Sequence, residues 1–215
     1  SAGNAWLDAL SGIGVCGLGH AHPAVTEAIR VQAGKLLHTS NLYGIPLQEA
    51  LADELTRVAG MDRAFFGNSG AEAVEGAIKL ARLYGHRRNN PQPAIIVAEN
   101  SFHGRTLATL SATGNRRVQA GFEPLVQGFI RVPYNDIDAL RTVARNSPQA
   151  VAVLIEPIQG ESGIQVPDPA YLDAVREICD SHEWLMMLDE IQSGMGRTGR
   201  WFAYQHHDWR PDVMA

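Results

Sequence analysis

The chain of 215 residues is long enough to bury one substantial core, and it carries 23 acidic and 18 basic side chains for a formal charge of −5. It therefore has no basic excess to hold nucleic acid, and no apolar run approaches the roughly 20 residues that span a bilayer. Two cysteines, Cys16 and Cys179, stand far apart without a metal-binding spacing, so we expect free thiols and a cytoplasmic protein.

The first 60 residues differ in pattern from the rest of the chain. A glycine-rich opening is followed by helical patterns near 23–36 and 47–59. The chain starts without Met in sequence typical of the interior of a domain, so we expect a piece of a longer protein. We expect residues 1–60 to form an N-terminal arm or part of a smaller domain.

From about Met61 onward, short apolar runs alternate with helical patterns, which is typical of an α/β fold with a mostly parallel sheet and helices on both faces. Residues 61–215 are accordingly predicted to form a larger domain, incomplete at its C-terminal end. Helices are expected near 70–85, 136–146 and 169–182. The runs predicted as strands are 64–66, 94–97, 129–132, 151–155 and 185–188.

Polar or glycine-rich clusters follow four of these predicted strands. They begin at Asn68, Ser101, Glu156 and Asp189. Because the carboxyl ends of parallel strands meet at one edge of a sheet, we expect the clusters to converge on one site. Taken alone, Asp189 has an ordinary alternative as a helix N-cap or as one half of a satisfied ion pair.

The segment 69–71 follows a predicted strand and opens a helix. Unpaired backbone N–H groups and the positive end of the helix dipole favour an anion there, and phosphate is the anion we expect. Many turns of this kind hold only water, which is the alternative interpretation.

Two other residues suit a flat heterocyclic ligand. The phenyl ring of Phe102 would cover such a ring, with simple core packing as the alternative. A carboxylate at Asp189 would raise the pKa of a pyridine nitrogen beside it and keep that nitrogen protonated. A phosphate cradle, a ring cover and a carboxylate at the ring nitrogen together describe pyridoxal 5'-phosphate (PLP).

Four ordered strings resemble the class III PLP-dependent aminotransferases, most closely the acetylornithine and ornithine aminotransferase branch. The strings are NSGAEA at 68–73, FHGRT at 102–106, EPIQGE at 156–161 and DEIQSG at 189–194. The resemblance covers nearly the whole chain and implies the large domain of a fold-type-I transferase that is a homodimer at full length. Val74 departs from the family, where asparagine is frequent.

The resemblance also implies which residues contact the cofactor phosphate. Gly70 and Ala71 would offer backbone N–H groups to it, and Ser69 would add its hydroxyl.

The ring contacts follow from the same resemblance. Phe102 and Ile191 would pack on the two faces of the pyridine ring, Asp189 would pair with its nitrogen, and Gln192 would approach its hydroxyl. His103 would belong to the wall of the site, with a structural hydrogen bond as the alternative.

The residues that the resemblance assigns to the substrate are Arg105, Glu156, Glu161 and Tyr43. Arg105 would bind the substrate carboxylate, a role that suits its planar guanidinium, which can donate two parallel hydrogen bonds to one carboxylate. Glu161 would pair with an arginine that lies outside this chain. Tyr43 would line the substrate pocket.

The lysine that forms the Schiff base in the family is not among the lysines of this chain. Its only lysines, Lys35 and Lys79, lie in predicted helices away from the strand ends, and we interpret both as exposed surface groups. The resemblance places the catalytic lysine a few residues beyond Ala215. We therefore expect no catalytic residue within the 215 residues and no activity from them alone. We also expect no metal site, because the pairs His20/His22 and His206/His207 have no third ligand at a suitable spacing nearby.

The reaction implied for the full-length protein moves the ω-amino group of N-acetylornithine, or of a similar ω-amino acid, to 2-oxoglutarate through PLP. An aminotransferase for 4-aminobutyrate or another ω-amino acid shares the same motifs and remains an alternative. The missing lysine leaves a second alternative, a catalytically inactive fragment or structural remnant. A dinucleotide-binding module is disfavoured because no GxGxxG turn follows the first strand.

Overall fold

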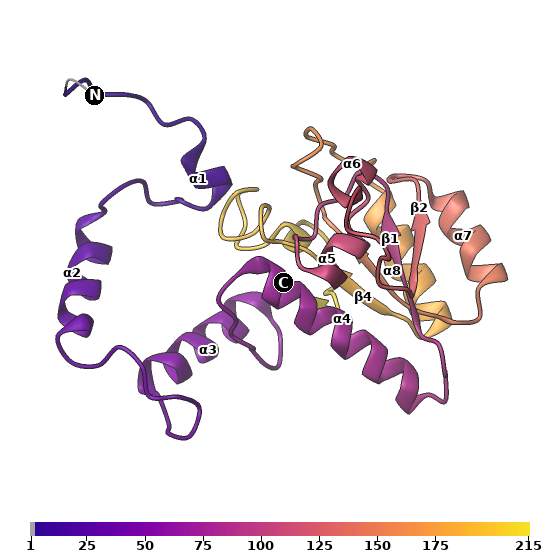
Figure 1. Ribbon diagram of the computed structural model, residues 1–215, viewed down its shortest axis with the longest axis horizontal. Helices are drawn as coiled ribbons and strands as arrows, with labels where there is room; N and C mark the ends of the chain where they lie inside the picture. Colours follow the sequence, from indigo (N-terminus) through magenta and orange to yellow (C-terminus); the bar gives the residue numbers. More distant parts are fainter. Residues whose placement is uncertain (1–2) are drawn as a thin grey trace.

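The computed structural model describes residues 3–215, and its centre is a sheet with strand order β2-β1-β3-β4-β5 in which all paired strands are parallel (Figure 1). The strands are β1 (Ala94–Ala98), β2 (Phe129–Val132), β3 (Ala150–Ile155), β4 (Leu185–Leu188) and β5 (Val213–Met214). The predicted α/β class with a parallel sheet is confirmed.

Both faces of the central strands are covered. Every residue of β1 and β3 is buried, which is why their sequences are continuous apolar runs without a polar face. Side chains alternate between the two faces, so Ile95 and Val97 join one core cluster while Ile96 and Ala98 join the other.

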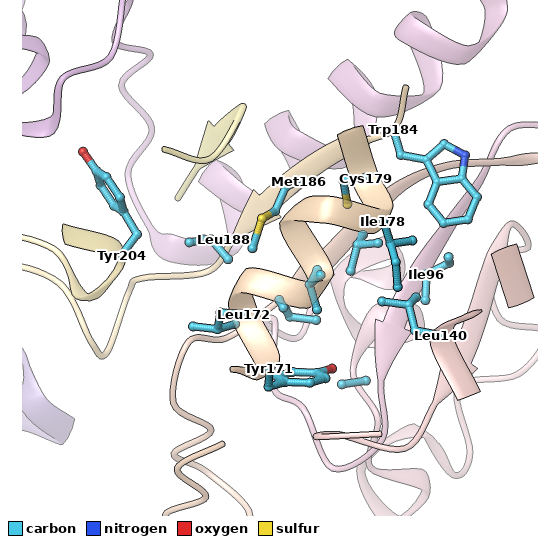
Figure 2. Packing of buried hydrophobic residues seen from close by; sticks show 14 of the residues in the cluster. Ile96, Leu140, Tyr171, Leu172, Ile178, Cys179, Trp184, Met186, Leu188 and Tyr204 are labelled. Atoms are coloured by element: carbon cyan, nitrogen blue, oxygen red, sulfur yellow. The ribbon is translucent and has the colours of Figure 1, made fainter. Parts of the chain in front are cut away.

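Helices on opposite faces complete these two cores. α4 (Gly70–Arg87) and α5 (Leu107–Ala112) pack on the face of Ile95, whereas α7 (Ile137–Asn146) and α8 (Tyr171–His182) pack on the other. Figure 2 shows the second core, where Ile178 and Cys179 of α8 lie beside Met186 of β4. The expected helices near 70–85, 136–146 and 169–182 are confirmed.

The N-terminal part is built differently. It contains α1 (Ser11–Gly14), α2 (Pro23–Ala33) and α3 (Pro46–Ala59), and it extends away from the sheet (Figure 1). None of the described residues before Ala59 is buried. The end of α3 is held by hydrogen bonds from the Tyr204 hydroxyl to the Ala59 carbonyl and from Gln205 Nε2 to the Val58 carbonyl, the latter 2.6 Å long.

One predicted strand is wrong. Residues 64–66 form no strand, and Phe65 is exposed. A strand needs a neighbour to accept and donate its backbone hydrogen bonds, and the sheet formed by residues 3–215 gives this run none. Its apolar composition alone could not reveal that.

Several short elements were not predicted, because they are shorter than the window in which a hydrophobic period is recognisable. They are α1, α5, α6 (Arg116–Gln119), the 3₁₀ helix η1 (Ala203–His206) and β5. No helix within residues 3–215 is long and apolar enough to cross a membrane.

Candidate active site

The predicted site segments lie at the carboxyl ends of the central strands. β1 lies between β2 and β3 in the sheet. The chain passes from β1 to β2 on one side of β1 and then to β3 on its other side. Such a switch in strand order opens a crevice in parallel sheets, and Phe102 and Glu156 follow the two strands that flank it. Asp189 follows β4, next in the sheet.

Side-chain contacts join these three strand ends. The backbone N–H of Phe102 donates to Glu156 Oε2 over 3.0 Å, which connects the segments after β1 and β3. His103 Nδ1 lies 2.8 Å from Asp189 Oδ2, which connects the segments after β1 and β4.

The start of α4 completes the group. An ideal Cβ on Gly70 would lie 2.5 Å from Cδ1 of Ile191, so the start of α4 lies directly against the segment after β4, and a side chain at position 70 would require Ile191 to shift. The Thr106 hydroxyl donates to the Glu75 carboxylate of α4. The structure thus brings all four predicted segments together, although the start of α4 follows a loop and not the expected strand.

Asp189 is 4% exposed and belongs to no described ion pair with lysine or arginine. Its Oδ1 accepts from the Ile191 N–H over 3.2 Å, and its Oδ2 faces His103 Nδ1. A carboxylate can only accept, so His103 is the donor. Asp189 is therefore a buried carboxylate with hydrogen bonds but without a full cationic partner in residues 3–215, an arrangement suited to receiving a positively charged ligand atom.

His103 is 2% exposed and does not face the solvent as a wall residue would. Its backbone N–H donates to Thr113 Oγ1 over 3.0 Å, and its Nε2 is buried with no partner in the described residues. The structure shows the hydrogen bond that the sequence analysis gave as one of two interpretations, and its acceptor is Asp189.

Glu156 is a second buried carboxyl group at this edge. Burial raises the pKa of Glu156 to about 7, while the nearby His103 ring and the Phe102 N–H act in the opposite direction. Its backbone carbonyl accepts from the Tyr134 hydroxyl over 3.0 Å. The group changes charge near neutral pH, and it contacts the backbone of Phe102 directly.

The start of α4 at Ser69 is held by two side-chain hydrogen bonds. Ser69 Oγ accepts from the Glu72 N–H over 3.3 Å, and the Glu72 carboxylate accepts from the N–H of Asn68, the residue before the cap, over 2.5 Å. The backbone N–H groups of Gly70 and Ala71 have no acceptor within the described chain. These two groups are the donors that an anion would use.

The remaining predicted site residues lie at the rim or beyond it. Gln192 lies against Gly160, where an ideal Cβ would be 2.3 Å from Gln192 Oε1. Arg105 is exposed, and its guanidinium carbon lies 5.9 Å from the centre of the Phe102 ring. Glu161 is exposed within a turn that the hydrogen bond from the Gly163 N–H to the Gly160 carbonyl closes. Tyr43 is 69% exposed in the N-terminal part, away from these contacts.

Both lysines are exposed, as predicted: Lys35 follows α2, and Lys79 lies in the middle of α4. Neither reaches the carboxyl edge of the sheet through any described contact.

Sequence reasoning missed two residues that order the site. Gln159 is buried, and its Nε2 donates to the Glu99 carbonyl over 2.9 Å. Glu190 is buried and accepts from Ser193 Oγ, Ala203 N and Tyr204 N, over 2.8, 2.8 and 2.9 Å. Their positions beside Gly160 and Asp189 were visible in the sequence. The Glu99 carbonyl and the backbone N–H groups of Ala203 and Tyr204, however, lie 60, 13 and 14 positions away and carry no local signal.

Comparison with known proteins places these observations in a family. The model of the family "aminotransferase class-III" matches residues 1–215. The chain is 59% identical over 213 residues to the acetylornithine aminotransferase of Nitrosomonas europaea, and the match covers 99% of this chain and 54% of that protein. The chain spans about half the length of the curated relatives it matches.

Solved structures give the same result for the fold. The crystal structure of N-acetylornithine aminotransferase from Stenotrophomonas maltophilia is 40% identical with a TM-score of 0.81, over 96% of this chain and 52% of that one. The crystal structure of ornithine aminotransferase from Toxoplasma gondii is 34% identical with a TM-score of 0.91, over 95% of this chain and 49% of that one.

Proposed function

This chain belongs to the class-III aminotransferase family, and we propose that the full-length protein moves the ω-amino group of N-acetylornithine, or of a similar ω-amino acid, to 2-oxoglutarate with PLP as cofactor. The observation that carries the proposal is the meeting of four motif segments at one edge of the sheet, through Gly70, Phe102, Glu156 and Asp189. The choice of donor rests on the similarity to acetylornithine aminotransferases.

The residues present fit PLP. The free N–H groups of Gly70 and Ala71 suit its phosphate, with Ser69 Oγ next to them. Asp189 is buried and carries no full cationic partner in residues 3–215, which suits a protonated ring nitrogen. PLP supplies an electron sink for the carbon atom that exchanges the amino group.

The ring position follows from the neighbours of Asp189. Phe102 follows β1 and is partly exposed, Ile191 follows β4 and is 39% exposed, and we assign their side chains to the two faces of the ring. Gln192 is assigned to the ring hydroxyl, and His103 lies behind Asp189.

The substrate residues are assigned at the rim. Arg105 is exposed and has no carboxylate partner in the described chain, so its guanidinium is free to bind the carboxylate of the amino donor. Glu161 is exposed in the loop that follows Glu156, where it can pair with an arginine of the longer protein. Glu156 holds the backbone of Phe102 and thereby the loop of Arg105. Tyr43 is assigned to the substrate pocket by resemblance alone.

The lysine that moves the proton between carbon atoms is proposed to follow Ala215 in the longer protein. The Ala215 N–H donates to the Leu188 carbonyl over 2.9 Å, and the Ala215 carbonyl accepts from the Glu190 N–H over 2.8 Å. Ala215 is therefore hydrogen-bonded to Leu188 and Glu190, the residues immediately before and after Asp189. A lysine shortly after Ala215 would lie at the same edge of the sheet.

We further propose a homodimer, with residues 1–60 as arm or small-domain segment and 61–215 as large domain. Its support is the exposed apolar surface of the N-terminal part, which includes Trp6, Leu7 and Leu37 and which a second copy would cover. A cytoplasmic location is consistent with the two free cysteines.

The full-length protein tests the proposal directly. Purified with PLP, it should form glutamate from 2-oxoglutarate with the highest kcat/KM for N-acetylornithine in a panel that includes ornithine and 4-aminobutyrate. Borohydride reduction followed by peptide mapping should place the cofactor on a lysine after Ala215. Preference for 4-aminobutyrate would reassign the donor, and a pyridoxyl adduct on Lys79 or Lys35 with turnover would overturn the site.

A further inference from the structure

β5 is the shortest strand of the described sheet, and its pairing with β4 covers only two positions. Asp212, the residue before β5, makes two further hydrogen bonds to Met186 of β4. Its backbone N–H donates to the Met186 carbonyl over 2.9 Å, and its Oδ2 accepts from the Met186 N–H over 2.8 Å. The carboxylate of Asp212 therefore adds a contact to a strand that has few of its own.

Arg176 of α8 binds the same carboxylate. Its Nη1 lies 2.8 Å from Asp212 Oδ2, the oxygen that also accepts from the Met186 N–H, and its Nη2 lies 2.6 Å from Asp180 Oδ1. The side chain of Arg176 is 10% exposed, whereas that of Asp180 is 67% exposed. α8, β4 and the start of β5 thus meet at one oxygen atom of Asp212.

We propose that Asp212, held by Arg176, is a positioning residue that fixes the register of β5 on β4. A pairing of two residues specifies register weakly, and a slip by one residue turns every side chain of a strand to the opposite face of the sheet. The bond from the Met186 N–H to the Asp212 side chain adds a fixed point beyond the two paired positions and so disfavours the slip.

The other end of β5 lies beside Asp189. Ala215 is hydrogen-bonded through its N–H to Leu188 and through its carbonyl to Glu190. A shift of β5 by one residue would break both bonds and displace the chain after Ala215 relative to the Asp189 carboxylate. The link to the reaction rests on the proposed function, which expects the reactive lysine in that part of the chain.

Three variants of the full-length protein separate this role from a general contribution to stability. Asp212→Ala removes the acceptor of the Met186 N–H, whereas Asp212→Asn keeps an oxygen acceptor at that position. Asp180→Asn is the matched control, because it changes the other carboxylate partner of Arg176 and leaves Asp212 intact.

Hydrogen exchange in the absence of PLP is the first readout. The Ala215 N–H reports the opening of β5, and the Ile95 N–H, which donates to the Gly128 carbonyl, reports the opening of the sheet at β1 and β2. In Asp212→Ala the Ala215 amide should exchange about 10-fold faster, the effect of one lost hydrogen bond to a charged group, at an unchanged Ile95 rate. Asp212→Asn and Asp180→Asn should stay within about threefold of the wild type. Equal acceleration at both amides, or an effect of Asp180→Asn as large as that of Asp212→Ala, would overturn the proposal.

The second readout is kinetic and depends on the proposed function. Asp212→Ala should lower kcat by about 10-fold and leave the KM for the amino donor within about twofold, because Arg105 has no described contact with Asp212. A rise in KM with unchanged kcat would overturn the link to the reaction. If borohydride traps no PLP on the wild type, the proposed function fails, and hydrogen exchange still decides the role of Asp212.

A measurement on the wild type covers the case in which the variants of Asp212 do not fold. The Met186 N–H is bonded to the Asp212 side chain and the Ala215 N–H to the Leu188 carbonyl, so one opening of β5 releases both. Their protection factors should agree within about threefold. A larger difference would show that the Asp212 side chain does not hold β5, and would overturn the proposal.

Discussion

The two edges of the sheet differ in what they bury. The carboxyl edge encloses four ionisable side chains, His103, Glu156, Asp189 and Glu190, each with hydrogen bonds to another segment. The amino edge carries a hollow of about 480 Å³ between the starts of β1, β2 and β3, and the side chains that line it include the exposed Arg82 and the buried Ala94.

This difference favours the carboxyl edge as the place of the candidate site. An open hollow filled with water costs little free energy, whereas buried ionisable groups are costly and persist where the structure orders them. Perturbed ionisable groups cluster at functional sites, and the carboxyl edge contains one in Glu156, whose pKa is raised by burial to about 7. A hollow by itself is therefore weaker evidence for a site than a set of buried charges.

The largest effect is expected at Asp189. In the full-length protein, Asp189→Asn should lower transamination by about 10³-fold or more while part of the cofactor is retained, because the neutral amide no longer stabilises a protonated ring nitrogen. Steady-state turnover and cofactor absorbance measure the two quantities. Gln149→Ala at the amino edge is the control, and its turnover should stay within twofold of the wild type. Near-normal turnover of Asp189→Asn would show that Asp189 has a structural role only.

A smaller effect is expected at Arg105. Arg105→Lys keeps the charge but loses the two-pronged geometry, so KM for the amino donor should rise by about 10- to 100-fold with an unchanged cofactor spectrum. Arg82→Lys places the same change at the amino-edge hollow and should leave KM unaltered. Equal KM values for Arg105→Lys and the wild type would remove Arg105 from the carboxylate site.

The raised pKa of Glu156 predicts that the stability of the protein depends on pH. Burial raises the pKa of Glu156 to about 7 from 4.5, so between these values the folded state binds more protons than the unfolded state. The free energy of unfolding should therefore fall as pH rises from about 4.5 to 7, by on the order of 1–3 kcal/mol, and then level off.

Glu156→Gln should flatten this slope, as measured by urea unfolding across the pH range. Glu183→Gln removes an exposed carboxylate just before β4, at the amino edge, and serves as the control. A slope that survives in Glu156→Gln would assign the titration to another group.

The smallest effect is expected at the hollow itself. Arg82→Ala loses the hydrogen bond to the Gln127 carbonyl, which is 2.6 Å long, and should cost about 1 kcal/mol of stability. Its kcat/KM should equal that of the wild type within twofold. A loss of activity in this variant would break the distinction between the two edges.

The sequence determined much of the fold because the signals are local. The runs 94–97, 151–155 and 185–188 are apolar on both faces, which only a covered parallel sheet accommodates, and the helical periods at 70–85 and 169–182 supply the covering faces. The run 64–66 has a similar composition but forms no strand, since pairing depends on a neighbour that composition does not encode.

For the site, the sequence determined which segments carry chemistry, because polar clusters after buried strands are visible in one dimension. Only the tertiary structure decided which side chains face one another. It turned His103 toward Asp189, buried Glu156 against the Phe102 N–H, and left Tyr43 outside these contacts. The reason is physical: such pairs join residues 54 to 86 positions apart in the chain, and their energy comes from burial and direction, which exist only once the strands are in register.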